Sequence, residues 1–185
     1  MYYVDTSVLI SYVFASDPGH HASRKALEDI VAKKQKLYAS SFTLVETCNT
    51  ICRKIIGEGR WKLIDPLQEY VDVYKDVEKR CRFLLSLIIS FLKERLDVHF
   101  VEVEDFYGFV PTTFNELKIP KIFKESIDLS YKLTIRIKDL LHLVYAFMLS
   151  KTRNIKYFLT RDVENFEKIK DKVKQLLRIE VLLIS

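Results

Sequence analysis

The sequence predicts an α/β protein in which a central parallel sheet is flanked by helices in three layers. Short runs of β-favouring apolar residues alternate with longer segments whose apolar residues recur every three or four positions. Strands that alternate with helices pair in parallel through right-handed crossovers. The 185 residues are 49% hydrophobic with only 4 glycines and 4 prolines. This composition predicts one globular domain over residues 1–185.

The first predicted element is a short strand, Tyr2–Val4, that ends directly at Asp5. A helix follows, with Thr6 or Ser7 as its predicted N-cap. The carboxyl ends of strands in an open α/β sheet face the ligand crevice, and this would direct Asp5 into it. An acid after a strand also commonly caps the next helix. The local sequence therefore leaves both roles open for Asp5.

The next two strand–helix steps bring a second candidate acid. A helix that begins at His20 and His21 precedes a short strand at 37–39, and Ser40 and Ser41 are candidate caps for the helix over 42–56. Glu46 lies in the second turn of that helix, beside its apolar stripe. An acid in such a place is ordinarily solvated, so the local context alone does not single out Glu46.

An enlarged helical segment is predicted between the second and third strands, within an insert over about 57–132. The periodic pattern over 66–96 predicts one helix, or two with a break near Lys79. A third strand is predicted at 98–103. The aromatic, irregular stretch 105–120 favours a loop over a cleft.

The last third of the chain continues the alternation of strands and helices. A helix starts near Asp139 and carries His142 one turn further on. A histidine hydrogen-bonded to the backbone or to an acid is favoured there over a catalytic base. A fourth strand, Tyr157–Thr160, is followed within two residues by Asp162. A further helix and a final strand at 179–184 complete the predicted sheet.

The composition limits which partners and which cellular compartment are expected for this protein. The net charge of +5 permits an anionic partner but does not require one. Three cysteines make no disulfide framework; Cys48 and Cys52 are interpreted as small core residues, and Cys81 has no metal-binding partners nearby. The most apolar run, 83–92, is too short to span a membrane, which needs roughly 20 residues. With no secretion signal at the start, a cytoplasmic location and no membrane partner are expected.

Four acids from distant segments are predicted to converge at one edge of the sheet. Asp5 and Asp162 both follow buried strands, and Asp139 opens a helix over the same edge. Glu46 lies within reach of it. Carboxylates at about 4 Å repel by roughly 4 kcal/mol at an effective dielectric of 20, so protons or cations must offset the charge. Mg²⁺ or Mn²⁺ accepts such ligands, and a pair of these ions activates water for phosphodiester hydrolysis.

Four segments carry a resemblance to a known family. They are 5–10 (DTSVLI), 40–46 (SSFTLVE), 138–143 (KDLLHL), and 160–162 (TRD) followed by Phe166. Together they resemble the PIN-domain nucleases, and the greatest similarity is to VapC-type ribonuclease toxins. The resemblance implies a PIN-like three-layer fold, Mg²⁺ or Mn²⁺ as cofactor, and cleavage of RNA.

The resemblance also implies roles for individual residues. The acidic quartet of the family, both catalytic and metal-binding, falls on Asp5, Glu46, Asp139 and Asp162. Ser7 matches a polar position beside the metal. Further contacts with the substrate or around the metal ligands are expected from Thr160, His142 and Arg161.

Two features depart from the family pattern. The segment between Glu46 and Asp139 is longer than in compact toxins of this type. Asp162 and Phe166 are one residue further apart than is usual, and Glu164 is the candidate for an additional acid there.

Three functional hypotheses follow. The first is a metal-dependent ribonuclease, and it extends to the toxin half of a toxin–antitoxin pair that forms a homodimer. The second is an inactive PIN-like module that binds RNA or a protein through the 57–132 insert. The third, an Asp-nucleophile phosphotransferase, usually needs a second acid two residues after the first, where this chain has Ser7. Aromatic residues in 105–114 could stack on RNA bases, and phosphate contacts could come from Arg53, Lys54, Arg60, Lys62, Lys132, Arg136, Lys138 and Arg161.

Overall fold

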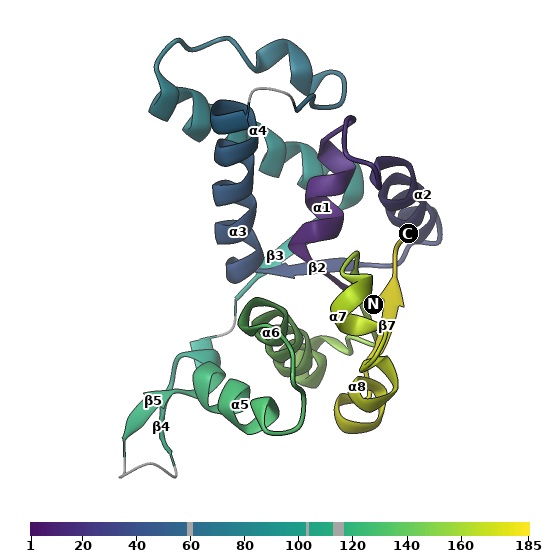
Figure 1. Ribbon diagram of the computed structural model, residues 1–185, viewed down its shortest axis with the longest axis vertical. Helices are drawn as coiled ribbons and strands as arrows, with labels where there is room; N and C mark the ends of the chain where they lie inside the picture. The colour runs from purple at the N-terminus through teal and green to yellow at the C-terminus, as the bar shows by residue number, and fades with distance from the viewer. Residues whose placement is uncertain (59–60, 103, 113–116) are drawn as a thin grey trace.

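A five-stranded parallel sheet forms the centre of the protein (Figure 1). The computed structural model describes residues 1–58, 61–102, 104–112 and 117–185. The strand order is β3-β2-β1-β6-β7, and every neighbouring pair is parallel. The strands are β1 (Tyr2–Val4), β2 (Leu37–Ser40), β3 (Val98–Val101), β6 (Tyr157–Thr160) and β7 (Glu180–Leu183). The predicted α/β fold with a parallel sheet is confirmed.

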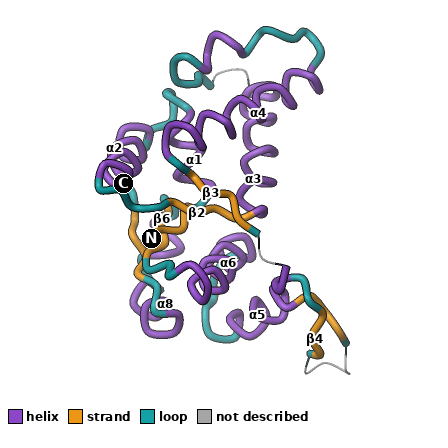
Figure 2. The backbone as a smooth tube through the Cα atoms, turned by 180° about the vertical axis from the view of Figure 1, so that it is seen from behind, coloured by secondary structure: helices purple, strands orange, loops and turns teal. Residues whose placement is uncertain are grey.

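Helices cover both faces of this sheet and complete three layers (Figures 1 and 2). One layer contains α1 (Thr6–Val13), α2 (His20–Ala32), α3 (Ser41–Cys52) and α4 (Val77–Leu96). The other contains α5 (Lys121–Ser130), α6 (Ile137–Arg153), α7 (Val163–Phe166) and α8 (Lys170–Leu177). Alternate strand residues face opposite layers, so Val4 lies in one hydrophobic cluster and Tyr3 in the other.

Local caps explain where the helices near the sheet edge begin. The Asp5 carboxylate accepts a hydrogen bond from the Ser7 backbone N–H at the start of α1. At the start of α3, Ser40 and Thr43 form a reciprocal capping box. The helix α6 ends at Asn154 in the left-handed conformation, which asparagine tolerates better than most residues. These caps fix the backbone on which the acidic side chains are carried.

The segment between β2 and β3 is helical, as predicted, but its subdivision differs. It contains η1 (Arg53–Glu58), η2 (Leu67–Tyr70) and α4. The helical pattern breaks before Val77 rather than near Lys79, because Asp76 caps α4 by accepting from the Lys79 backbone N–H. Downstream, β3 ends at Val101, while Val103 of the predicted strand lies outside the described residues.

The expectation of an irregular loop at 105–120 is wrong in part. This stretch contains η3 (Glu104–Phe106) and an antiparallel hairpin of β4 (Phe109–Pro111) and β5 (Lys118–Pro120). The hairpin projects away from the sheet (Figures 1 and 2). Strands of three residues are too short for the alternation of polar and apolar residues to reveal them.

The cysteine prediction also needs correction. Cys81 on α4 does have a neighbouring thiol, because the Cys52 thiol on α3 interacts with both Cys81 and Cys48. Burial, together with these two thiols, raises the pKa of Cys52 to about 12. All three are free, half-buried thiols rather than fully buried core residues.

Within the described ranges, no helix combines the length and the apolarity that crossing a bilayer requires. The apolar run at 83–92 lies in α4 and places Leu84, Ile88 and Leu92 in the core. The run is therefore part of a core helix.

Candidate functional site

The polar cleft lies at the carboxyl edge of the sheet, around the strand where the topology changes direction. From β1 the chain crosses to β2 on one side, and it later returns to β6 on the other side. Ligand crevices of open α/β sheets form at such switch points. Asp5 follows β1 directly, and its backbone N–H donates to the Leu159 carbonyl of β6 at 3.0 Å. The two strands that precede Asp5 and Asp162 are therefore neighbours.

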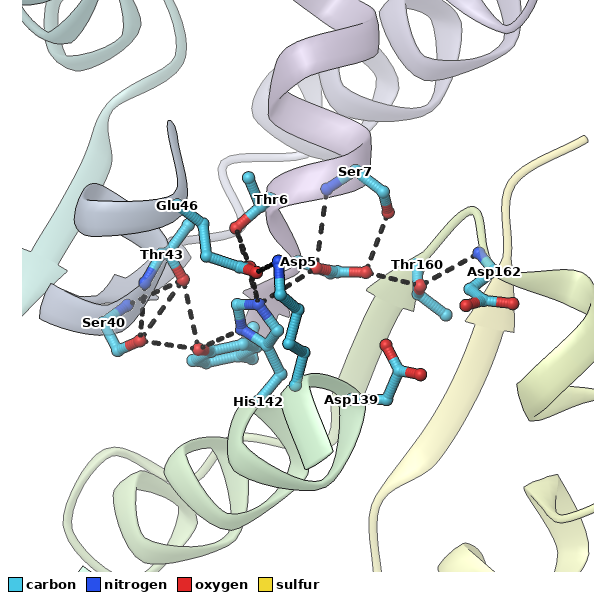
Figure 3. A network of polar contacts seen from close by, with 12 residues as sticks. Asp5, Thr6, Ser7, Ser40, Thr43, Glu46, Asp139, His142, Thr160 and Asp162 are labelled. Atoms are coloured by element: carbon cyan, nitrogen blue, oxygen red, sulfur yellow. Dashed lines mark hydrogen bonds and ion pairs between the residues drawn. The ribbon is translucent and has the colours of Figure 1, made fainter. Parts of the chain in front are cut away.

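The four predicted acids line the same cleft, which has a volume of about 210 Å³ (Figure 3). Its lining residues are Asp5, Thr6, Ser7, Ile10, Glu46, Thr50, Lys138, Asp139, His142 and Asp162. The structure thus brings together side chains from α1, α3, α6 and the segment after β6. The predicted convergence of the four acids at one edge of the sheet is observed.

Asp5 is held in place by three hydrogen bonds. It is 6% exposed. Its Oδ2 atom accepts from Ser7 Oγ at 2.8 Å and from Thr160 Oγ1 at 2.6 Å, while Oδ1 accepts from the Ser7 backbone N–H at 3.4 Å. Asp5 therefore caps α1 and lines the cleft at the same time. The two roles that the sequence left open are compatible.

Glu46 is the best-compensated acid of the cleft. Its Oε2 atom accepts from Thr6 Oγ1 at 3.0 Å and from His142 Nε2 at 2.6 Å, and its Oε1 atom lies 3.0 Å from Lys138 Nζ. Burial would raise its pKa, but these three partners together lower the pKa of Glu46 to about 2. The Glu46 carboxylate is consequently ionised at neutral pH.

His142 connects this acid with Asp5 and with the sheet. The ring is 1% exposed, and Nε2 also lies 3.3 Å from Asp5 Oδ1. A carboxylate only accepts hydrogen bonds, so Nε2 carries a proton. On the other side, Nδ1 lies 3.0 Å from the hydroxyl of the buried Tyr3. The predicted contact between His142 and an acid is present, but the acids are Glu46 and Asp5, and not the nearby Asp139.

Tyr3 fixes the far side of the imidazole. Its hydroxyl lies 2.8 Å from Ser40 Oγ and 3.2 Å from Thr43 Oγ1, within the capping box of α3. Burial, the largest cause, raises the pKa of Tyr3 far above its usual value. The neutral phenol keeps a proton that it can donate to Nδ1 of His142. This chain of contacts links the cap of α3 to the floor of the cleft.

Asp139 and Asp162 form the other side of the cleft. Asp162 caps α7, where its Oδ1 atom accepts from the Asn165 backbone N–H at 3.0 Å. Burial, followed by the charges of Asp162 and Asp5, raises the pKa of Asp139 to about 6. Negative charge on this side is therefore less well compensated than around Glu46.

The donor set fits a hard divalent cation. Carboxylate oxygens are the ligands that Mg²⁺ and Mn²⁺ prefer. Ligand atoms of Asp5, Glu46 and His142 lie within 4.8 Å of one another, a spacing that a metal ion could occupy. For His142 to ligate, Nε2 would have to lose the proton that it now shares with two carboxylates. The four acids are therefore better candidate ligands than the imidazole.

The remaining predicted site residues have different surroundings. Ser7 and Thr160 both hold Asp5, as described above. Arg161 does not line the cleft. Its Nη1 atom donates to Asp17 Oδ1 at 2.6 Å and to Ser11 Oγ at 2.9 Å. This guanidinium ties the loop after β6 to the turn between α1 and α2, where it lies so close to Gly19 that a Cβ atom there would be 1.9 Å from the guanidinium carbon.

Some predicted RNA contacts also lie elsewhere. Lys54 Nζ stacks over Trp61, 2.9 Å from the ring centroid. Lys138 lines the cleft and is 67% exposed at its side chain. Arg60 lies outside the described residues.

Sequence reasoning missed residues whose role depends on tertiary contacts. Glu164, the predicted additional acid, is exposed and does not line the cleft. Its neighbour Asn165 contacts Asp139 and Asp162 instead. The only feature of the sequence that pointed to Asn165 was its position three residues after Asp162, the N-cap of α7. Tyr3 and Thr6 flank the predicted strand end, but nothing in their spacing revealed the contacts with His142 and Glu46.

Fold and site together define a class of protein: a three-layer α/β domain with an acidic cleft at the switch point of a parallel sheet. Residues 2–87 match the family model of the PIN domain, and this match includes Asp5 and Glu46. The resemblance to PIN domains that the motifs predicted is confirmed over these residues. No match is found among curated proteins.

The fold is also similar to that of a solved structure. This is the VapBC2 complex from Rickettsia felis bound to a DNA fragment from their promoter, of which one chain aligns with a TM-score of 0.50 and 17% sequence identity. The alignment covers 100% of this chain and 98% of that one. At this identity the likeness establishes the shared fold. The enlarged segment between β2 and β3 lies within the aligned length.

Proposed function

We propose that this protein is a metal-dependent endoribonuclease that hydrolyses RNA phosphodiester bonds with Mg²⁺ or Mn²⁺. The observation that carries the proposal is the cleft lined by Asp5, Glu46, Asp139 and Asp162. Like charges gathered at one edge need compensation. On the Asp139 side, the raised pKa indicates that the surrounding protein groups do not supply it in full.

The acids would hold the cation, and the other residues would hold the acids. A bound divalent ion supplies an activated water and stabilises the leaving oxygen of a phosphodiester. Ser7 and Thr160 orient the Asp5 carboxylate, and His142 donates to Glu46 and lies 3.3 Å from Asp5. Each of these contacts reduces the freedom of a ligand before the cation arrives.

Lys138 is the best candidate for a phosphate contact at the mouth of the cleft. Its ammonium group lies 3.0 Å from Glu46 Oε1, yet most of its side chain is exposed. The Lys138 ammonium group can turn from Glu46 to a phosphate oxygen of the substrate. Neutralising phosphates with lysine or arginine is the usual source of nucleic-acid affinity.

We further propose an antitoxin protein as partner and a homodimer as the assembly. Two observations support a protein partner near the site. The first is the shared fold with a chain of a VapBC2 complex. The second is the exposure of two large apolar residues next to cleft residues: Val45, 65% exposed, precedes Glu46, and Ile137, 64% exposed, precedes Lys138.

The second candidate function is an inactive PIN-like module that binds RNA or protein through the 57–132 segment. The exposure of apolar side chains on and beside the hairpin favours it, with Phe109 at 70% and Phe123 at 51%. Such a module does not need a cation at the acidic cleft. Metal binding therefore separates the two candidates.

The deciding experiment compares RNA cleavage by the wild type and by Asp5→Asn in Mg²⁺ or Mn²⁺. Cleavage is expected from the wild type and not from the variant, with single-stranded DNA of the same sequence as the substrate control. Glu164→Gln serves as the matched control, because it removes an exposed acid outside the cleft. Equal cleavage by wild type and Asp5→Asn would overturn the proposal. Calorimetry with Mn²⁺ then asks whether the cleft binds the ion at all.

A further inference from the structure

One side-chain amide joins the two acids on the less compensated side of the cleft. Asn165 Nδ2 lies 3.0 Å from Asp139 Oδ2 and 2.6 Å from Asp162 Oδ2. Carboxylates accept hydrogen bonds, so the amide group must present its nitrogen to them. That nitrogen carries two hydrogens, one for each carboxylate. Asn165 thus satisfies both acids without adding a charge.

The backbone around Asn165 fixes the direction of this amide. Its own N–H donates to Asp162 Oδ1 at 3.0 Å, which completes the cap of α7. The next residue, Phe166, is fully buried and packs against Phe158 of β6 in a tilted arrangement, with ring centroids 5.1 Å apart. The backbone of Asn165 is therefore anchored on one side by the helix cap and on the other by a buried aromatic residue.

The geometry leaves ligand positions free for a cation. The amide engages Oδ2 of Asp139, while Oδ1 of that residue has no hydrogen bond within the described part of the chain. Each carboxylate oxygen offers two lone-pair directions, so the engaged oxygens also keep acceptor capacity. The amide can orient both carboxylates without blocking them.

We propose that Asn165 is a positioning residue that holds Asp139 and Asp162 in place as ligands for the divalent cation. The inference rests on the proposed function for the identity of the ion, but it concerns binding rather than cleavage. Groups that hydrogen-bond to metal ligands typically affect metal affinity by about 10–100-fold when they are removed. Without the bridge, the two acids repel each other and turn apart.

The first test measures Mn²⁺ binding to Asn165→Leu by isothermal titration calorimetry. Leucine has a similar volume and no donor. We expect Mn²⁺ to bind about 10–100-fold more weakly than to the wild type. Glu164→Gln, which alters the neighbouring exposed residue, should bind like the wild type. Unchanged affinity in Asn165→Leu would overturn the proposal. Should that variant fail to fold by circular dichroism, Asn165→Ser is measured instead, since one hydroxyl cannot reach both acids as a donor.

A double-mutant cycle separates positioning from general support of the fold. The effect of Asn165→Leu on the Mn²⁺ dissociation constant is measured in the wild type and again in Asp139→Asn. If Asn165 acts by orienting Asp139, its effect shrinks in the second background. Equal effects in both backgrounds would assign it a structural role only.

Steady-state RNA cleavage supplies a further readout. In Asn165→Leu at saturating Mn²⁺, kcat should fall while KM for RNA is retained, because the amide orients metal ligands and contacts no phosphate. If Asn165→Leu weakens Mn²⁺ binding as expected but the wild type leaves RNA intact, only the proposed function is refuted. If the wild type cleaves RNA and Asn165→Leu binds Mn²⁺ normally, only the positioning role is refuted.

Discussion

His142 Nε2 lies 2.6 Å from Glu46 Oε2 at the buried floor of the acidic cleft. This contact connects helices whose residues are almost 100 positions apart in the chain, α3 and α6. The same nitrogen lies 3.3 Å from Asp5 Oδ1, so the imidazole is close to two acids. The imidazole is therefore a structural centre of the cleft as well as part of its lining.

Replacing this imidazole should destabilise the protein. In His142→Leu, Glu46 loses a buried hydrogen-bond donor, and the expected loss is about 1–3 kcal/mol of unfolding free energy. Urea denaturation of the metal-free protein measures it. The control is His21→Leu, since His21 is exposed. A loss no larger than that of the control would contradict the role assigned to His142.

The pH dependence of Mn²⁺ binding should report Asp139. Its pKa of about 6 means that the carboxyl is largely protonated at pH 5 and ionised at pH 7.5. Because a protonated carboxyl is a poor ligand, Mn²⁺ affinity should rise through this interval. Calorimetry at pH 5, 6 and 7.5 tests this. In Asp139→Asn, the part of the rise that Asp139 causes should disappear.

The raised pKa of Asp139 also predicts how the stability of the metal-free protein varies with pH. The pKa of Asp139 in the folded protein is above the ordinary value of 3.8. Between these two pKa values, the folded state keeps a proton on this carboxyl that the unfolded state has lost. The contribution of Asp139 to stability is therefore lost as pH rises from about 4 through 6. Asp139→Asn should be more stable than the wild type above pH 6 and similar to it near pH 3.5. Exposed Asp171→Asn is the control, and a constant difference across this range would contradict the assignment.

Arg161 should matter for stability rather than for substrate binding. Arg161→Gln removes the ion pair with Asp17, which ties the loop after β6 to the start of α2. We expect about 1–3 kcal/mol of lost stability, with KM for RNA unchanged. Thermal unfolding and steady-state kinetics measure the two effects. A raised KM with unchanged stability would instead support the substrate contact that the family resemblance implied.

The protein should unfold as one domain over 1–185. The segment 57–132 contributes Leu84 to the hydrophobic cluster on one face of the sheet and Ile122 to the cluster on the other. Elements shared in this way cannot separate without exposing both cores. Circular dichroism and tryptophan fluorescence should report a single, coincident urea transition. Two resolved transitions would show that the insert is an independent domain.

Much of the fold was predictable because the sheet strands are short, apolar and separated by periodic helices. The predicted Tyr2–Val4 and Tyr157–Thr160 have the bounds found in β1 and β6. Register and strand order depend on contacts between distant residues, and the hairpin at β4 and β5 is too short to show a period. These features could not be derived from local pattern.

The site was also predictable only in part. Asp5 and Asp162 follow strands, and a strand end indicates where a side chain must be. Glu46 is in an ordinary helical position, and its local context did not single it out. Asn165 gave no chemical signal, since a neutral amide becomes significant only when the fold places two carboxylates around it.

The position of β1 between β2 and β6 has a consequence for how the cleft is completed during synthesis. Asp5 and Glu46 leave the ribosome well before Asp139, Asp162 and β6, the later of the two strands that pair with β1. Until β6 emerges, a nascent chain holds half of the carboxylates or little more and lacks one neighbour of its central strand. The complete acidic centre therefore cannot form until more than 160 residues have been synthesised.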